Sequence, residues 1–174
     1  YDIDDNSAIP NSDLLYMQQL SSMNTVAIVK DEDGIYQRCQ FSMIRNSTSG
    51  SYEGHLDQKE ELKGNAAMIE DAEYTVIDKL NGFLYFSIGN KLYTYRKGID
   101  ECVEVNLQGV NFDPIVSLNV IAHNDYKANI FVATYSETNK GKVYRLTPES
   151  TDSRNLTVEE VIDTEGAVKC ITYW

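Results

Sequence analysis

The sequence predicts an all-β protein, a β-propeller-like array of four-stranded antiparallel blades, and three observations lead to this fold class. Short apolar runs separated by turn residues follow one another along the 174-residue chain. Tyrosine, which favours strands, occurs twelve times, whereas proline occurs three times. A hairpin signature of a turn residue, an aliphatic residue and a tyrosine recurs at Tyr36, Tyr93 and Tyr144. Its spacings of 57 and 51 residues suit propeller blades, so we expect a single propeller-type domain over 1–174.

The first blade is expected over 12–64 and is the least regular. Its clearest strand covers 25–29, and an Asp-Gly turn, a strong hairpin signal, leads into a return strand over 35–44. Two other segments fit either a short helical turn or an outer strand, because they are too short to separate the two periodicities. These are 11–20 and 58–63.

The second blade, 65–109, and the third, 110–164, each have the pattern of a complete four-stranded meander. The strands expected in the second blade are 74–80, 83–88, 91–96 and 102–107. Those expected in the third are 115–122, 130–135, 142–147 and 156–162. The run 83–86 is apolar on both faces, which indicates a sheet covered on both sides. Residues 167–174 are expected to add a closing strand that pairs with another blade.

Charge and composition exclude several classes of function. The formal net charge is −12 and no basic cluster occurs, so we expect no nucleic-acid partner. No apolar run is long enough to span a bilayer, so we expect no direct membrane insertion of this segment. The acidic start, without an initiator methionine, predicts a piece of a longer protein and no signal peptide. Cys39, Cys102 and Cys170 are interpreted as free core residues, not as a disulfide framework.

The sequence predicts no metal site, no cofactor and no catalytic residues. Asp2, Asp4 and Asp5 resemble part of a calcium loop, but the glycine and the distal glutamate of such a loop are missing. His55 and His123 lack the nearby ligands of a zinc site, and no Gly-x-Ser-x-Gly motif accompanies them. We therefore interpret the acidic start as solvated and both histidines as surface or loop residues.

Candidate ligand-binding residues come from the aromatic side chains and their polar neighbours. Tyr126 lies in a polar loop with His123 and Asp125, and Trp174 ends the chain. An aromatic ring at the rim of a propeller can stack on a sugar ring, so these four residues are the predicted ligand contacts. The repeated tyrosines at 36, 93 and 144 are instead expected to pack between blades.

Several stretches carry a family resemblance between Asn65 and Trp174. They are Asn81 to Tyr95 (NGFLYFSIGNKLYTY), Asn129 to Tyr135 (NIFVATY), Gly141 to Tyr144 (GKVY) and Gly166 to Trp174 (GAVKCITYW). Together they resemble the C-terminal propeller region of the PKD-like family of Bacteroidetes surface lipoproteins. The resemblance implies an exported, lipid-anchored protein of the outer membrane, cell surface or periplasm. It also implies immunoglobulin-like modules before the propeller and a location near glycan uptake systems.

These observations predict a non-enzymatic exported binding or scaffold module, part of a surface lipoprotein, that contacts a glycan or a surface protein. An incomplete ring leaves edge strands, so self-association through them is also expected. The alternative is a propeller-type carbohydrate-active hydrolase or lyase whose carboxylates converge at the central axis. Three or more carboxylates, or a histidine–acid pair, in one central pocket would favour that alternative.

Overall fold

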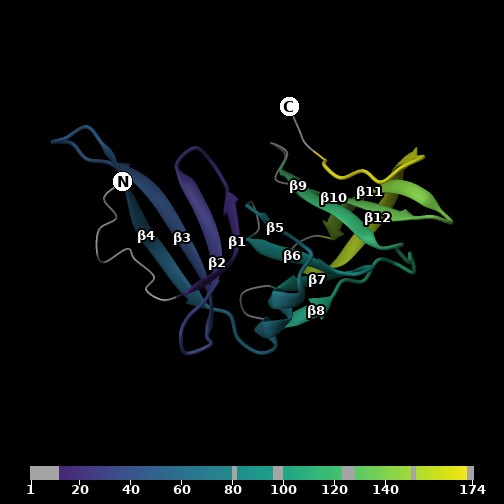
Figure 1. The fold of residues 1–174 in the computed structure, drawn as a ribbon, viewed down its shortest axis with the longest axis horizontal. Coiled ribbons are helices and arrows are strands. Elements are labelled where there is room, and N and C mark those ends of the chain that lie inside the picture. Colours follow the sequence, from purple (N-terminus) through teal and green to yellow (C-terminus); the bar gives the residue numbers. More distant parts are fainter. Residues whose placement is uncertain (1–11, 80–81, 96–99, 123–127, 150–151, 172–174) are drawn as a thin grey trace. The chain divides into compact units, whose positions relative to one another are not determined.

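The structure is a computed structural model that describes residues 12–79, 82–95, 100–122, 128–149 and 152–171 (Figure 1). Within these residues, twelve strands form three four-stranded antiparallel sheets, and one short 3-10 helix is present. The all-β prediction is therefore confirmed. The chain divides into two compact units, 1–67 and 68–174, which are described separately.

The first unit contains the first sheet, in which the strands pair in chain order. They are β1 (Asp13–Gln19), β2 (Asn24–Lys30), β3 (Tyr36–Arg45) and β4 (Tyr52–Glu61). The sequence left two segments open between a helical turn and a strand, and they lie in β1 and β4. Pairing of the backbone with β2 and β3 makes them strands, whereas the residue pattern of such short segments could not distinguish the two. The structure therefore settles both alternatives in favour of an outer strand.

The second sheet follows the 3-10 helix η1 (Ala66–Asp71). Its strands are β5 (Tyr74–Asp78), β6 (Phe83–Ile88), β7 (Lys91–Tyr95) and β8 (Cys102–Glu104). Aromatic and aliphatic residues fill β6, as a strand buried on both faces requires. Gly89 has a φ of 62° in the two-residue turn between β6 and β7, a conformation that glycine adopts without steric cost.

The third sheet repeats this plan with longer strands. They are β9 (Ile115–Ala122), β10 (Ala128–Ser136), β11 (Lys140–Glu149) and β12 (Asp152–Thr164). The three sheets fall within the ranges 12–64, 65–109 and 110–164 that the sequence assigns to blades. The two groups of four strands predicted within 65–109 and 110–164 thus each correspond to one sheet.

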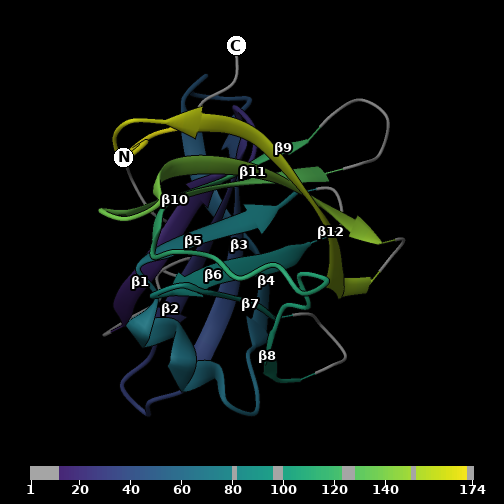
Figure 2. The ribbon, with the colours of Figure 1, turned by 90° about the vertical axis from the view of Figure 1, so that its right-hand side faces the viewer.

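Within the second unit, the second and third sheets lie next to each other (Figure 2), and they share one apolar core. Phe83, Tyr85 and Leu92 contribute to this core from the second sheet, and Val132 and Leu146 contribute from the third. Two further links join the sheets at their margins. At one, the backbone N–H of residue 115 donates to the carbonyl of residue 89 at 2.9 Å; at the other, residues 106 and 155 form a parallel bridge.

Tyr93 and Tyr144 occupy corresponding places in their sheets, because Tyr93 pairs with Glu104 and Tyr144 pairs with Glu160. In the third sheet, Tyr144 itself packs in the core between the two sheets. In the second sheet, it is Leu92, the neighbour of Tyr93, that packs in this core. Adjacent strand residues point to opposite faces, so Tyr93 faces away from the third sheet. The corresponding tyrosines therefore point in the same direction, and the two sheets are related head to tail.

Tyr36 pairs with Lys30 at the end of its hairpin, and Nζ of Lys30 lies over its ring, 5.6 Å from the ring centre. The packing of Tyr36 between blades stays a prediction. Two finer expectations are corrected. The closing strand is not formed over 167–171, and 172–174 lie outside the described residues. Cys170 is exposed because it lies in that strand-free segment; all three cysteines are free, and the other two are buried.

Candidate functional site

The four residues predicted to contact a ligand are His123, Asp125, Tyr126 and Trp174, and all four lie outside the described residues. Their role stays a prediction. The described residues include two polar clusters and a partly exposed apolar surface, none of which contains these four residues.

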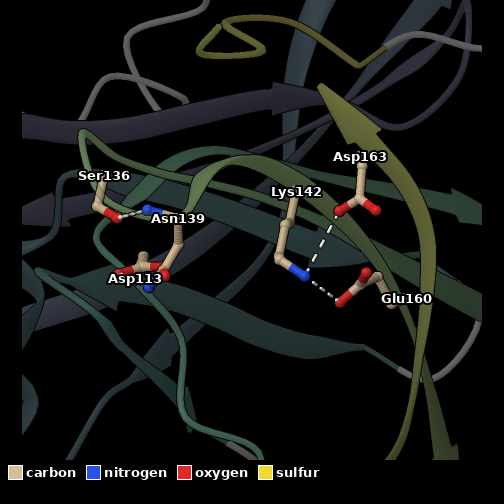
Figure 3. Close-up of polar contacts among 6 residues, drawn as sticks. All are labelled: Asp113, Ser136, Asn139, Lys142, Glu160 and Asp163. Carbon is tan, nitrogen blue, oxygen red and sulfur yellow. Dashed lines mark hydrogen bonds and ion pairs between the residues drawn. The ribbon is translucent and has the colours of Figure 1, made fainter. Parts of the chain in front are cut away.

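The first polar cluster, which we call the β11–β12 cluster, lies on the last two strands of the third sheet (Figure 3). Lys142 on β11 places Nζ 2.8 Å from Oε2 of Glu160 and 3.4 Å from Oδ1 of Asp163, both on β12. The strand register brings these side chains together. Lys142 pairs with Asp163, and a bulge in β12 then places Glu160 opposite Tyr144. One ammonium group is thus shared by two carboxylates.

A neighbouring turn carries a second set of polar contacts in the same view (Figure 3). Asn139, between β10 and β11, donates from Nδ2 to Oδ2 of Asp113 at 3.0 Å. Its backbone N–H donates to Oγ of Ser136 at 3.0 Å. The first bond ties the turn to the segment that precedes β9, and the second lies within the turn itself.

The pKa of Tyr144 is affected by charges from both sets. Burial raises the pKa of Tyr144, and the carboxylate of Glu160 raises it further. The smaller electrostatic effects on that pKa come from Lys142, Asp113 and Asp163. The phenol therefore remains protonated at neutral pH and can donate a hydrogen bond to an oxygen atom.

The second sheet contains the same arrangement of lysine, tyrosine and glutamate. Lys91 Nζ lies 2.7 Å from Oε2 of Glu104, which pairs with Tyr93 as Glu160 pairs with Tyr144. A group that recurs at the same place in two sheets has a role common to both sheets. We therefore interpret these ion pairs as links between the third and fourth strand of each sheet.

The second polar cluster lies on the first sheet and contains a serine, a histidine and an aspartate. His55, on β4, places Nδ1 3.1 Å from Oδ1 of Asp57, and Oγ of Ser42 donates to the same oxygen at 2.8 Å. In a serine hydrolase the serine contacts the histidine, whose other ring nitrogen contacts the acid. Here both side chains contact the acid, so the order of contacts is not that of a catalytic triad.

The apolar surface is one face of the first sheet. A bulge between Leu14 and Tyr16 places Leu14 and Met17 on the same face, because they pair with Val29 and Ala27. Leu14 is 59% exposed and Met17 is 62% exposed. Both lie beside an apolar cluster on this face, in which Ala27, Val29 and Cys39 are buried and Phe41 and Leu56 are partly buried. We call these seven residues the first-sheet face.

Sequence reasoning could have found one of these groups. His55 and Asp57 are two residues apart, which is the spacing of side chains on one face of a strand. By contrast, Lys142 and Glu160 meet only through the strand register. The first-sheet face depends on the bulge at Leu15, for which the sequence has no glycine or proline signal.

Neither polar cluster supplies a metal site: among the residues that the structure describes, no group of three or more histidine, cysteine, aspartate or glutamate side chains is placed to hold a metal ion. The same residues include no helix that is long and apolar enough to cross a membrane. No family model, curated protein or solved structure matches the chain.

Proposed function

We propose that this chain is a non-enzymatic binding or scaffold module that contacts a protein partner through the first-sheet face. The observation that carries the proposal is the exposure of Leu14 and Met17 beside an apolar cluster. Burying exposed aliphatic surface contributes about 25 cal/mol per Å² to association, and an exposed apolar patch marks an interaction site.

The chemistry of this face favours a protein over a glycan. Sugar rings stack on flat aromatic rings, whereas Leu14 and Met17 are flexible aliphatic side chains. Such side chains pack best against other aliphatic groups, which a protein surface supplies.

The proposal includes a propeller-like arrangement in which the three sheets are consecutive blades. The head-to-tail relation of Tyr93 and Tyr144 supports it, because blades of a propeller repeat one rotation. The resemblance to the PKD-like lipoproteins extends the proposal to an exported protein of the cell surface or periplasm. Fractionation of the source cells with an antibody against the chain tests this location, and recovery in the cytosol would contradict it.

The binding surface can be tested with the chain itself as the protein probe. Amide NMR spectra of the wild-type chain, recorded at rising concentration, should show shifts concentrated at residues 13–19 and in the neighbouring positions of β2. Shifts confined to other strands, or unchanged spectra, would contradict the proposed face.

A panel of immobilised glycans tests the competing ligand class. The proposal predicts no retention of the wild-type chain. If the wild-type chain is retained and a Tyr126→Ala variant is not, the ligand is a glycan and not a protein. Tyr126 would then be the contact residue, as the sequence predicts.

A further inference from the structure

The ends of β3 and β4 and the turn between them extend past the rest of the first sheet. β2 begins at Asn24, which pairs with Ser42, so residues 43–54 lie beyond the end of β2. We call this two-stranded segment the hairpin tip, and Figure 1 shows it reaching beyond β1 and β2. A two-stranded hairpin has little stability of its own in water, so the contacts within the hairpin tip matter.

The turn of the hairpin tip is held by one side chain. Asn46 accepts at Oδ1 the backbone N–H of Thr48 at 2.9 Å and that of Ser49 at 3.1 Å. Its Nδ2 donates to Oε1 of Glu53 at 2.7 Å, which links the two strands. The hairpin tip is therefore preorganised, and this lowers the entropic cost of binding a partner.

One face of the hairpin tip carries a methionine, an arginine and a tyrosine around a glycine. Met43 pairs with Gly54 and Arg45 pairs with Tyr52, and residues that pair across antiparallel strands share a face. Tyr52 is 50% exposed, Arg45 is exposed and Met43 is half-buried. Tyrosine, methionine and arginine are enriched in protein interfaces, so this face has the composition of a contact surface.

Gly54 is the third residue of β4, and the fold of the chain does not require a glycine there. Its φ is not positive, so other residues can adopt its backbone conformation. A Cβ atom added to it would meet no atom within 4 Å, so no neighbouring group needs the missing side chain. A glycine inside a strand weakens the strand and often marks a place where a ligand approaches the backbone. The space above Gly54 is open to such a ligand.

This space suits one aromatic ring. Tyr52 and Leu56 are the next residues of β4 on the same face, and a strand rises about 3.3 Å per residue, so each lies about 6.6 Å from Gly54 along the strand. Aromatic rings stack with their centres about 4.5–7 Å apart. Within the described ranges, no aromatic ring stacks on that of Tyr52. A ring above Gly54 thus lies at stacking distance from a ring that has no aromatic partner there.

Arg45, which lies across from Tyr52, supplies a positive charge. Among the residues that the structure describes, no carboxylate forms an ion pair with it. The formal net charge of the chain is −12, so acidic side chains are abundant elsewhere. A guanidinium group binds a carboxylate through two parallel hydrogen bonds, so Arg45 favours an acidic ligand.

We infer that the hairpin tip binds a peptide segment of a partner protein in which an aromatic residue lies beside an acidic residue. The aromatic ring occupies the space above Gly54 and stacks on Tyr52, and the carboxylate pairs with Arg45. The site adjoins the first-sheet face at Leu56 and depends on other side chains. It is therefore a second binding site and does not rest on the proposed function.

Selection from a random library of peptides identifies the ligand. The library is first depleted on the immobilised Gly54→Val variant and then applied to the immobilised wild-type chain. We expect enriched sequences in which a phenylalanine, tyrosine or tryptophan lies next to an aspartate or glutamate. The most enriched sequence is synthesised with a fluorescein label, and its binding is measured by fluorescence anisotropy.

Binding of the labelled peptide is then compared among four variants of the full chain. Gly54→Val fills the space and Arg45→Glu reverses the charge, and each should weaken binding at least about tenfold. The loss in Arg45→Glu should be smaller at high salt, because ions screen the charge. Ile44→Ala, on the opposite face of the hairpin tip, and Met17→Lys, on the first-sheet face, should leave binding unchanged.

Thermal unfolding of Gly54→Val separates a binding role of the glycine from a structural one. Valine favours strands, and its Cβ meets no atom within 4 Å here, so the midpoint of unfolding should rise by about 2 to 5 °C. A lower midpoint would show that folding requires the glycine and would count against the inference. The Arg45→Glu variant tests the site independently of this substitution.

The inference is overturned if no sequence is enriched, if the enriched sequences lack an acidic residue, or if Gly54→Val and Arg45→Glu leave binding intact. Binding that Met17→Lys abolishes and Gly54→Val preserves would place the peptide on the first-sheet face. That result would overturn this inference and support the proposed function. Conversely, loss of the proposed face leaves a peptide that depends on Gly54 and Arg45 unaffected.

Discussion

Lys142 Nζ lies 2.8 Å from Oε2 of Glu160, and Lys91 Nζ lies 2.7 Å from Oε2 of Glu104 at the corresponding place in the preceding sheet. The side chain of Lys142 is 28% exposed and that of Lys91 is 51% exposed. The two ion pairs therefore have the same geometry in environments of different solvent access.

The first prediction compares these two pairs. Glu160→Gln should lower the midpoint of thermal unfolding at low salt more than Glu104→Gln does, because solvent weakens an exposed ion pair. High salt should remove most of the difference by screening the charges. Circular dichroism at two ionic strengths measures both effects, and equal or salt-independent losses would contradict the prediction.

The second prediction concerns alkaline stability and Tyr16. Burial raises the pKa of Tyr16 to about 12, from an ordinary value near 10.0. The unfolded chain therefore loses its proton first, so the stabilisation due to Tyr16 is complete below about pH 10 and is lost as the pH rises toward 12. Tyr16→Phe should make the free energy of unfolding less dependent on pH in this range.

Denaturant titrations at several alkaline pH values test the Tyr16 prediction. Tyr52→Phe is the matched control, because Tyr52 is 50% exposed. An equal effect of both substitutions on the pH dependence would contradict the assignment to Tyr16.

The third prediction concerns a buried hydroxyl. Thr134 is 1% exposed, and its Oγ1 has no hydrogen-bond partner among the described residues. Thr134→Val replaces the hydroxyl by a methyl group of similar size and should raise the free energy of unfolding by about 1 kcal/mol. Thr147→Val should instead lower it by a similar amount, because Thr147 Oγ1 donates to Asn129 at 3.1 Å. Denaturant unfolding measures both variants, and two changes of the same sign would refute this reasoning.

The fourth prediction concerns the turn between β2 and β3. The carboxylate of Asp31 accepts bonds from the backbone of Asp33 at 3.1 Å, the backbone of Ile35 at 2.8 Å and the side chain of Gln37 at 2.7 Å. Asp31→Ala should therefore cost about 1 to 3 kcal/mol of stability. Asp33→Ala is the control and should cost less, as measured by chemical denaturation; a larger loss in the control would show that the bonds to Asp31 do not carry the turn.

The strands were predictable where side chains and turns give strong signals. The aromatic and aliphatic run from Phe83 to Ile88, followed by Gly89, indicates a buried strand and a tight turn, and the structure has both. Other features depend on partners distant in the chain. Residues 13–19 become a strand by pairing with β2, whereas 167–171 form no ladder with the strands that they cross.

The polar clusters were harder to predict than the strands because register decides them. Lys142 and Glu160 are separated by 18 positions, and no local pattern places them together. The exposure of Leu14 and Met17 on one face likewise depends on a single bulge, since ordinary alternation would put them on opposite faces. The spacing of His55 and Asp57, in contrast, is a local signal that strand geometry could have used.

The comparison that bears most directly on the proposed binding face is sedimentation equilibrium of the wild-type chain, Met17→Lys and Ile44→Lys over one range of concentrations. Both substitutions add a charge at an exposed apolar side chain, so solubility changes alike in the two variants. We expect concentration-dependent association in the wild type and in Ile44→Lys, and a monomer throughout in Met17→Lys. Equal association of the two variants would contradict a binding surface centred on Leu14 and Met17.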